Sequence, residues 1–325
     1  MMTELLDDRS LVFGIDLEGC EELTVATSHE SLQQSKQIWL HLCNIDDVIE
    51  SWLQHHSALD PDQHAVLFSE ADRPRFFPNN DDLLLVFRAI NCNPGSDPED
   101  MVALHIYASA DLMISIRHKK VIAVQDTKKA LLRRGKPTRT GEVLASICEK
   151  IADRISDTIE SMEKEADDLE DQVVNTESRL LRVQLAAFRR KTITLRRFLA
   201  PQREMFAHLA VHSCSWLLPE DHRILRESSE MITKACEDLD SLREHSVITQ
   251  EELASRLGER MERITCLLTI VATIFLPLGF LTGLMGINLG GMPGAKDSHA
   301  FWIFCGLLAA ILTVELAIFR KNKWL

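Results

Sequence analysis

The stretch ATIFLPLGFLTGLMGINLGGMPG, residues 272–294, is an apolar helical pattern that ends in a glycine-rich turn. It closes an uncharged run of 24 residues, 264–287, and the hydrocarbon of a bilayer is crossed by about 20 helical residues. A second run of 19 residues, 301–319, is interrupted only by Glu315. Two buried helices of a soluble protein could show such runs, but two of them so close together favour a helical hairpin in a membrane.

Basic residues flank this hairpin on one side. The link between the spans, residues 288–300, holds one lysine, whereas basic residues precede the first span and form the tail 320–325 after the second. By the positive-inside rule we expect both termini in the cytoplasm, with the protein in the cell's inner (plasma) membrane. The first ten residues are acidic and polar, which predicts no cleavable signal peptide.

Composition narrows the class of protein. The net charge is −13, from 49 acidic residues against 36 Lys and Arg, which argues against nucleic acid as a partner and is compatible with cations. The eight cysteines lack paired spacing, so neither a disulfide scaffold nor a zinc ribbon is predicted. We find no nucleophile with a base and no phosphate-binding glycine loop, so we expect neither an enzyme nor a cofactor.

The N-terminal part, residues 1–136, predicts a mixed α/β domain. Short apolar runs alternate with turn-rich polar stretches, a helical pattern covers 46–55, and 93–100 reads as a turn. The predicted strands cover residues 37–42, 65–68, 82–90, 101–108 and 112–118.

Two helices of opposite charge are predicted next, within residues 137–220. An apolar residue recurs every three or four positions from Leu144 to Val173, while 149–171 carries ten carboxylates. Residues 178–203 carry eight basic residues and no acidic one. The pattern fits an antiparallel pair with complementary surfaces, or an acidic sleeve that gathers divalent cations.

One very long helix is predicted to follow as a stalk, residues 221–263, and to run on through the membrane. The stretch 222–286 contains no proline except Pro277, and at 1.5 Å per residue it would span roughly 97 Å. Such a helix cannot bury its sides within one subunit of this size. We therefore expect several copies around an axis.

One face of the first span is small and hydroxylated. At 100° per residue, this narrow stripe consists of Thr265, Thr269, Ala272, Leu276, Gly279 and Gly283. The stripe fits a packing seam between membrane helices, or the wall of a pore with Leu276 as an apolar gate. Asn288 could cap the helix, or could form a ring of amide oxygens around a hydrated cation.

These residues carry a family resemblance. Gly286-Ile287-Asn288 resembles the Gly-Met-Asn signature of the CorA family of divalent metal transporters, with isoleucine in place of methionine. Residues 272–294 look like that family's pore helix and outer loop. The cytoplasmic segments resemble its zinc-transporting branch, ZntB; they are NPGSDPEDMV (93–102), RHKKV (117–121) and LRRFLAPQRE (195–204).

The resemblance implies a pentameric funnel: a homopentamer with α/β cytoplasmic domains, five pore-lining helices and an outer ring formed by the second spans. Gly286, Ile287 and Asn288 would form the selectivity ring, with Thr273 and Leu276 at or near the pore. The transported ion would be Zn²⁺ or a similar divalent cation, with coupling to protons left open. Isoleucine in the signature puts tight magnesium selectivity in doubt.

Zinc prefers histidine and cysteine, yet the predicted pore face has neither, so we expect the ion to pass partly hydrated. His212 and Cys214 form a possible soft site in the cytoplasmic part, and Asp297 and His299 are candidate proton sensors in the outer loop. Glu315 is expected to reach the interface or to pair with an arginine. Two other functions stay open: a magnesium or cobalt channel, and a membrane-anchored coiled-coil scaffold or sensor.

Overall fold

The computed structural model describes residues 11–24, 28, 36–43, 73–175, 179–287 and 299–321. By its contacts the chain divides into two compact units, Met1–Gln250 and Glu251–Leu325. The strands predicted at 65–68 and the helix predicted at 46–55 lie outside the described residues.

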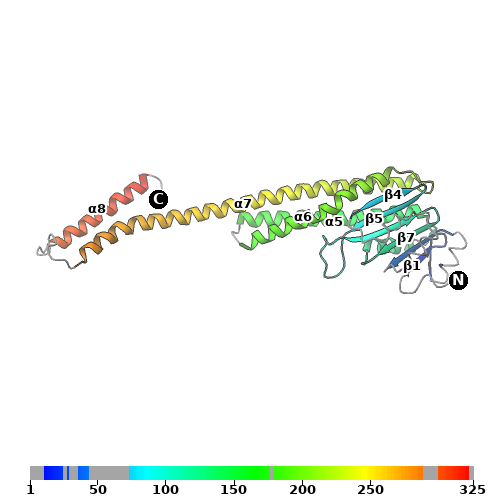
Figure 1. The fold of residues 1–325 in the computed structure, drawn as a ribbon, viewed down its shortest axis with the longest axis horizontal. Helices are drawn as coiled ribbons and strands as arrows, with labels where there is room; N and C mark the ends of the chain where they lie inside the picture. Colours follow the sequence, from blue (N-terminus) through cyan, green and yellow to red (C-terminus); the bar gives the residue numbers. More distant parts are fainter. Residues whose placement is uncertain are drawn as a thin grey trace. The chain divides into compact units, whose positions relative to one another are not determined.

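The first unit contains a seven-stranded sheet (Figure 1). Its order is β2-β1-β3-β7-β6-β5-β4, and only the β3–β7 pair is parallel. The strands are β1 (Leu11–Asp16), β2 (Glu21–Leu23), β3 (Ile38–Cys43), β4 (Arg75–Asn79), β5 (Asp82–Ala89), β6 (Val102–Ala108) and β7 (Leu112–Arg117). The strands predicted from the apolar runs near β3, β5, β6 and β7 are confirmed.

Three strands were not predicted, because their sequences lack the usual pattern. Pro78 interrupts β4, which is tolerated because β4 is an edge strand. The opposite edge, β2, has only three residues and two of them are glutamates, which discourages pairing with another chain. In β1, Gly14 is required by packing, since an added Cβ would lie 2.8 Å from Ser28 Oγ.

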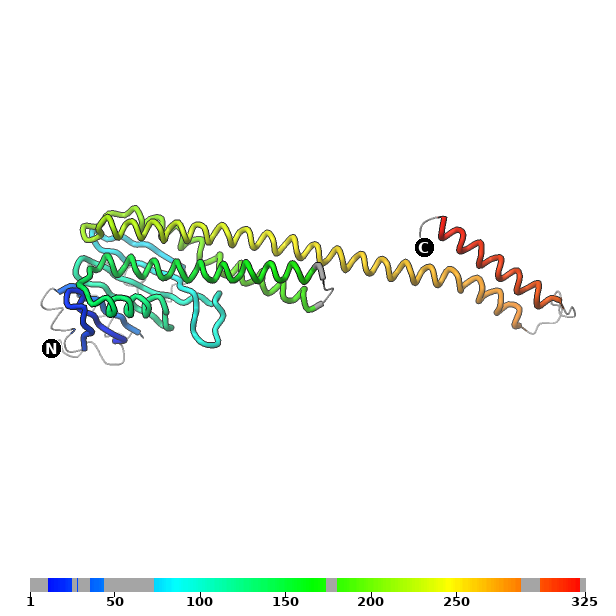
Figure 2. The backbone as a smooth tube through the Cα atoms, turned by 180° about the vertical axis from the view of Figure 1, so that it is seen from behind, coloured from blue at the N-terminus to red at the C-terminus, as the bar shows by residue number. Residues whose placement is uncertain are grey.

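Five helices follow the sheet in the chain. They are α4 (Ile122–Arg134), α5 (Thr140–Asn175), α6 (Arg179–Val211), α7 (Pro219–Met285) and α8 (Ala300–Lys321). The continuous helix predicted at 222–286 is confirmed as α7, whereas α4 was not predicted. In the first unit, α5, α6 and the first part of α7 run side by side next to the sheet (Figure 2).

The predicted apolar stripe of α5 is buried, with Ile147, Ile155 and Ile159 at most 2% exposed. Between α5 and α6, Lys191 Nζ forms an ion pair with Glu165 Oε2 at 2.8 Å. Arg196 in α6 instead pairs with Asp240 in α7, and the Arg196 guanidinium lowers the pKa of that carboxyl. Basic residues of α6 therefore form ion pairs with both α5 and α7. Most carboxylates of residues 160–171 are exposed.

A polar cluster lies inside the sheet. Trp39 Nε1 donates to Ser115 Oγ at 2.9 Å, and His41 Nδ1 is 2.8 Å from the same oxygen. Burial and the positive charge of Arg117 lower the pKa of His41 to about 3. The imidazole is consequently neutral in the folded protein at physiological pH.

Candidate functional site: the membrane helices

Two helices of the second unit are long and apolar enough to cross a membrane, namely the end of α7 and the whole of α8. The spans predicted at 264–287 and 301–319 coincide with these helical stretches. In both views α8 runs back along the last part of α7 (Figures 1 and 2).

The side of α7 that is turned toward α8 can be read from burial. Within this span Ile270, Ile274, Leu278 and Leu281 are half-buried, and at 100° per residue they fall on one side of the helix. The half-buried residues of α8 likewise recur every three or four positions from residue 304 to 315. The partly shielded side chains of α7 are therefore large and aliphatic, whereas those of α8 include Cys305 and Glu315 beside larger apolar residues.

The small hydroxylated stripe lies on the opposite side of α7. Every member of the stripe is exposed, and Leu276 is 74% exposed. An added Cβ at Gly279 or Gly283 would meet nothing within 4 Å. Within one chain, therefore, these small residues do not serve close packing between the two spans. Thr273, which the resemblance placed near the pore, is also exposed but lies about 80° from the centre of the stripe.

The threonine hydroxyls in this span donate to the preceding turn of the helix. Thr265 Oγ1 donates to Met261 O, and Thr269 Oγ1 donates to Thr265 O, both at 2.8 Å. Each hydroxyl proton is thus used inside the helix, while the oxygen lone pairs face outward. A row of such oxygens can accept hydrogen bonds from the water shell of a cation.

The C-terminal end of the span closes at Gly286, whose N–H donates to Thr282 O at 3.0 Å. Ile287 follows at 48% exposure. Asn288 and Asp297 lie outside the described residues, so their predicted roles stay predictions. His299 is exposed just before α8, and its carbonyl oxygen accepts the N–H of Ile303.

The pair His212 and Cys214 lies at the C-terminal end of α6. The His212 ring meets Phe76 edge-on, with centroids 5.4 Å apart. Cys214 is buried, and burial together with the charge of Asp81 raises its pKa to about 11, which keeps the thiol protonated. Among the described residues no group of three or more histidine, cysteine or carboxylate side chains could hold a metal ion. The soft site stays a prediction, with two ligands at most from this part of the chain.

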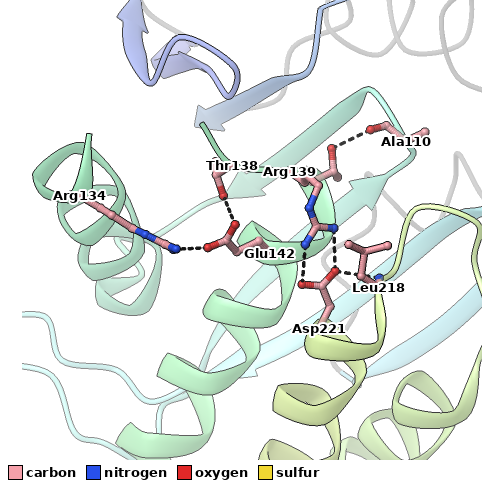
Figure 3. Close-up of polar contacts among 8 residues, drawn as sticks. Ala110, Arg134, Thr138, Arg139, Glu142, Leu218 and Asp221 are labelled. Atoms are coloured by element: carbon pink, nitrogen blue, oxygen red, sulfur yellow. Dashed lines mark hydrogen bonds and ion pairs between the residues drawn. The ribbon is translucent and has the colours of Figure 1, made fainter. Parts of the chain in front are cut away.

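The helix that carries the stripe is anchored at its other end by a buried carboxylate. Asp221 is 2% exposed; it accepts the Leu218 N–H at 2.9 Å and pairs with Arg139 Nη1 at 3.0 Å (Figure 3). An added Cβ at Gly141 would lie 2.6 Å from the Asp221 carboxylate. This anchor joins the start of α5 to the start of α7.

Sequence reasoning did not identify the anchor. An acidic residue in the first turn of a helix, three residues after Leu218, is the signal that could have indicated Asp221 as a cap. The partner Arg139 is 82 residues away in the chain, and no local pattern indicates it.

In this chain the last helix of the α/β unit continues into an apolar hairpin. The hydroxylated face of that helix is turned away from the second span. These two features define a membrane protein of the ion-transporter type. The family model of the CorA-like Mg²⁺ transporter protein matches residues 34–321. The chain belongs to this family, which consists of ion transporters.

Curated relatives match over nearly the full length. The divalent cation transporter CmaX of Pseudomonas aeruginosa is 34% identical, and the match covers 98% of each chain. The zinc transport protein ZntB of Yersinia enterocolitica is 32% identical over 97% of this chain and 96% of the relative.

Solved structures support the same fold. The full-length CmaX structure superposes with a TM-score of 0.82 at 33% identity, covering 99% of this chain and 100% of the other. The CorA magnesium transporter of Methanocaldococcus jannaschii superposes with a TM-score of 0.75 at 20% identity, covering 89% and 92% of the two chains. Together with the curated relatives, these structures establish the CorA-like fold for this chain and support divalent cation transport as its function.

Proposed function

We propose that this chain is a homopentameric transporter that moves Zn²⁺ and similar divalent cations across the inner membrane. The observation that carries the proposal is the position of the small hydroxylated stripe, on the side of α7 opposite to α8. Lipid offers no partner for a row of hydroxyl oxygens, whereas the axis of a ring of identical helices does.

The ion follows the stripe of α7 in this proposal. Leu276 forms the narrow apolar ring of the pore, and the threonine oxygens on its inner side bind the hydrated ion. Pro277 has no N–H, so it cannot donate to the carbonyl of Thr273 one turn earlier, and this carbonyl is a further oxygen ligand close to the gate. Gly286, Ile287 and Asn288 form the outer selectivity ring.

Zinc is favoured over magnesium by the curated relatives named as zinc transport proteins and by isoleucine in the outer motif. Both termini and the α/β unit lie in the cytoplasm, because the basic flanks of the spans are on that side. Asp297 and His299 then face the outside. This loop is where an inward proton gradient is coupled to uptake, because it carries the two candidate proton sensors.

The first test is metal flux into proteoliposomes that contain the purified protein. We expect Zn²⁺ uptake that exceeds Mg²⁺ uptake and that rises when the lumen is alkaline relative to the outside. Magnesium uptake that is insensitive to pH would instead identify a magnesium or cobalt channel. No uptake of either metal would favour a membrane-anchored scaffold.

A matched pair of variants tests the pore face. Thr269→Val removes a hydroxyl from the stripe, and Thr313→Val removes one from α8, where Thr313 makes the same type of bond to the preceding turn at 2.7 Å. Both changes keep the side-chain volume and lose one local hydrogen bond. We expect Thr269→Val to reduce zinc flux at least about tenfold and Thr313→Val to leave it within about twofold. Equal effects would show that α7 has no special role.

The outer ring is tested by Asn288→Leu, which removes the amide oxygen. In a transporter this change abolishes selective uptake while the pentamer is retained on size-exclusion chromatography with light scattering. In a scaffold, the loss of this amide would leave function unchanged.

A further inference from the structure

Two large apolar side chains lie on the outside of the helices in the first unit. Ile193 of α6 is 48% exposed, and Ile248 of α7 is 63% exposed. The described part of α5 has no large apolar side chain that is exposed in this way. Exposed aliphatic residues bordered by charged residues are typical of a surface that binds another protein.

On α6 the exposed isoleucine lies between two arginines. Arg190, Ile193 and Arg197 are all exposed, and at about 100° per residue they fall on one side of the helix, opposite to the buried Leu195. Neither arginine takes part in any ion pair found for the described residues. We call these three residues the basic face of α6.

On α7 the exposed isoleucine is accompanied by glutamates. Glu237, Glu244 and Ile248 are exposed on one side of the helix, opposite to the buried Leu239. Both glutamates are likewise absent from the ion pairs of the described residues. These three residues form the acidic face of α7. The two faces therefore share an aliphatic residue and carry opposite charges.

The two faces lie at the same level along the helices. In one chain, Arg189 Nη1 donates to Gln250 Oε1 at 3.4 Å, and Arg196 Nη2 donates to Asp240 Oδ2 at 3.0 Å. These contacts align α6 with α7, so the basic face and the acidic face begin and end within a few residues of these two pairs. Copies in a ring are related by rotation about its axis, which keeps the level of each residue along that axis.

The faces also point in suitable directions. Each pair of the three helices is in contact, since Lys191 of α6 pairs with Glu165 of α5, Arg196 pairs with α7, and α5 and α7 line one cavity of about 250 Å³. The outer sides of three helices packed as a triangle are turned from one another by roughly 120°, and a closed ring of five joins two sides of each subunit turned by roughly 108°.

We propose that the basic face of α6 in one copy packs against the acidic face of α7 in the next copy of this chain. The inference rests on the homopentamer of the proposed function and names the surfaces that assemble it. Ile193 and Ile248 cover each other, and the arginines meet the glutamates. Each copy contributes two different surfaces, so the contact runs head to tail around the ring, and the repulsion of like faces excludes the reverse pairing.

The first test is thiol cross-linking of the full-length protein in detergent. A double variant, Ile193→Cys with Ile248→Cys, is treated with a short bismaleimide and separated on a denaturing gel. We expect a ladder of linked subunits, whereas each single variant should give only the background of the native cysteines. Ser161→Cys replaces Ile248→Cys in the matched control, because Ser161 is exposed on α5. A ladder of equal yield in this control would overturn the proposal.

Charge reversal tests the electrostatic part in the same double-cysteine protein. Arg197→Glu should lower the cross-linking yield at least about fivefold, and addition of Glu237→Arg should restore it to within about twofold. Arg133→Glu changes the net charge as Arg197→Glu does, at an exposed position in α4, and should leave the yield unchanged. A yield that Glu237→Arg does not restore would contradict the pairing of the two faces.

A second reversal guards against a fold defect, because the Arg197 guanidinium lies 4.8 Å from the centre of the Phe198 ring. Arg190→Glu with Glu244→Arg changes the other charged pair. We expect the same loss and the same restoration, with thermal unfolding unchanged in all variants. Restoration in neither pair would overturn the proposal.

Light scattering of the unmodified protein separates this inference from the proposed function. The mass of five subunits without a cross-linked ladder would overturn the inference and leave the pentamer in place, whereas the mass of one subunit would overturn both. Labelling with a bulky maleimide identifies the occupant. Slow labelling of Ile193→Cys in the assembled protein is expected, and rapid labelling would show that no copy covers this face and that it is open to a different protein.

Discussion

Removal of the buried carboxylate at the start of α7 should destabilise the α/β unit strongly. Asp221 is 2% exposed and pairs with Arg139 at 3.0 Å and 3.4 Å, while it also accepts the Leu218 N–H. Loss of one partner of a buried ion pair costs about 3–5 kcal/mol, and loss of a helix cap costs about 1 kcal/mol. Because the Arg139 side chain is 34% exposed and can turn to water, we expect about 3 kcal/mol for Asp221→Ala.

The assay is thermal unfolding of the full-length protein in detergent, followed by tryptophan fluorescence. For a unit of this size, about 3 kcal/mol corresponds to a decrease in Tm of roughly 6–12 °C. Asp221→Asn keeps an acceptor for Leu218 and should lose about 2 kcal/mol. A double-mutant cycle with Arg139→Met isolates the ion pair, with an expected coupling of about 2 kcal/mol. Additive losses would refute the reasoning, because they would show that the two side chains stabilise the unit independently.

Three further predictions concern the pore face and the sheet. Leu276→Ser should raise basal ion leak in proteoliposomes, because it removes the apolar ring that excludes water. Gly283→Leu should block zinc flux without loss of the fold, whereas Gly306→Leu in α8 should permit it, although both glycines have open space at Cβ in one chain. The pKa of His41 is about 3 in the folded protein and 6.5 in the unfolded chain. Its contribution to the free energy of unfolding is therefore fully present above pH 6.5 and is lost as the pH falls below that value. By pH 5 the loss is about 2 kcal/mol, and His41→Leu should flatten this part of a curve of Tm against pH.

The membrane hairpin and the long helix could be predicted from local sequence pattern alone. A run of 24 uncharged residues and the absence of proline between residues 222 and 276 are properties of the chain itself. Periodicity likewise indicated the buried side of α5, since an apolar residue at every third or fourth position has few other interpretations. The edge strand β4 was not predicted, because local pattern does not indicate it: it contains Pro78, and it forms a strand by pairing with β5.

The sequence by itself determined the class of protein, the two spans and the composition of the stripe, because hydrophobicity and helical spacing act over short distances along the chain. It could not decide whether the small residues of α7 form a seam with α8. That required the tertiary structure, in which the half-buried side of the α7 span carries large side chains and lies opposite the small residues. Contacts such as Arg139 to Asp221, 82 residues apart, were likewise decided only by folding. Their energy comes from burial and charge pairing between distant parts of the chain, which no local pattern records.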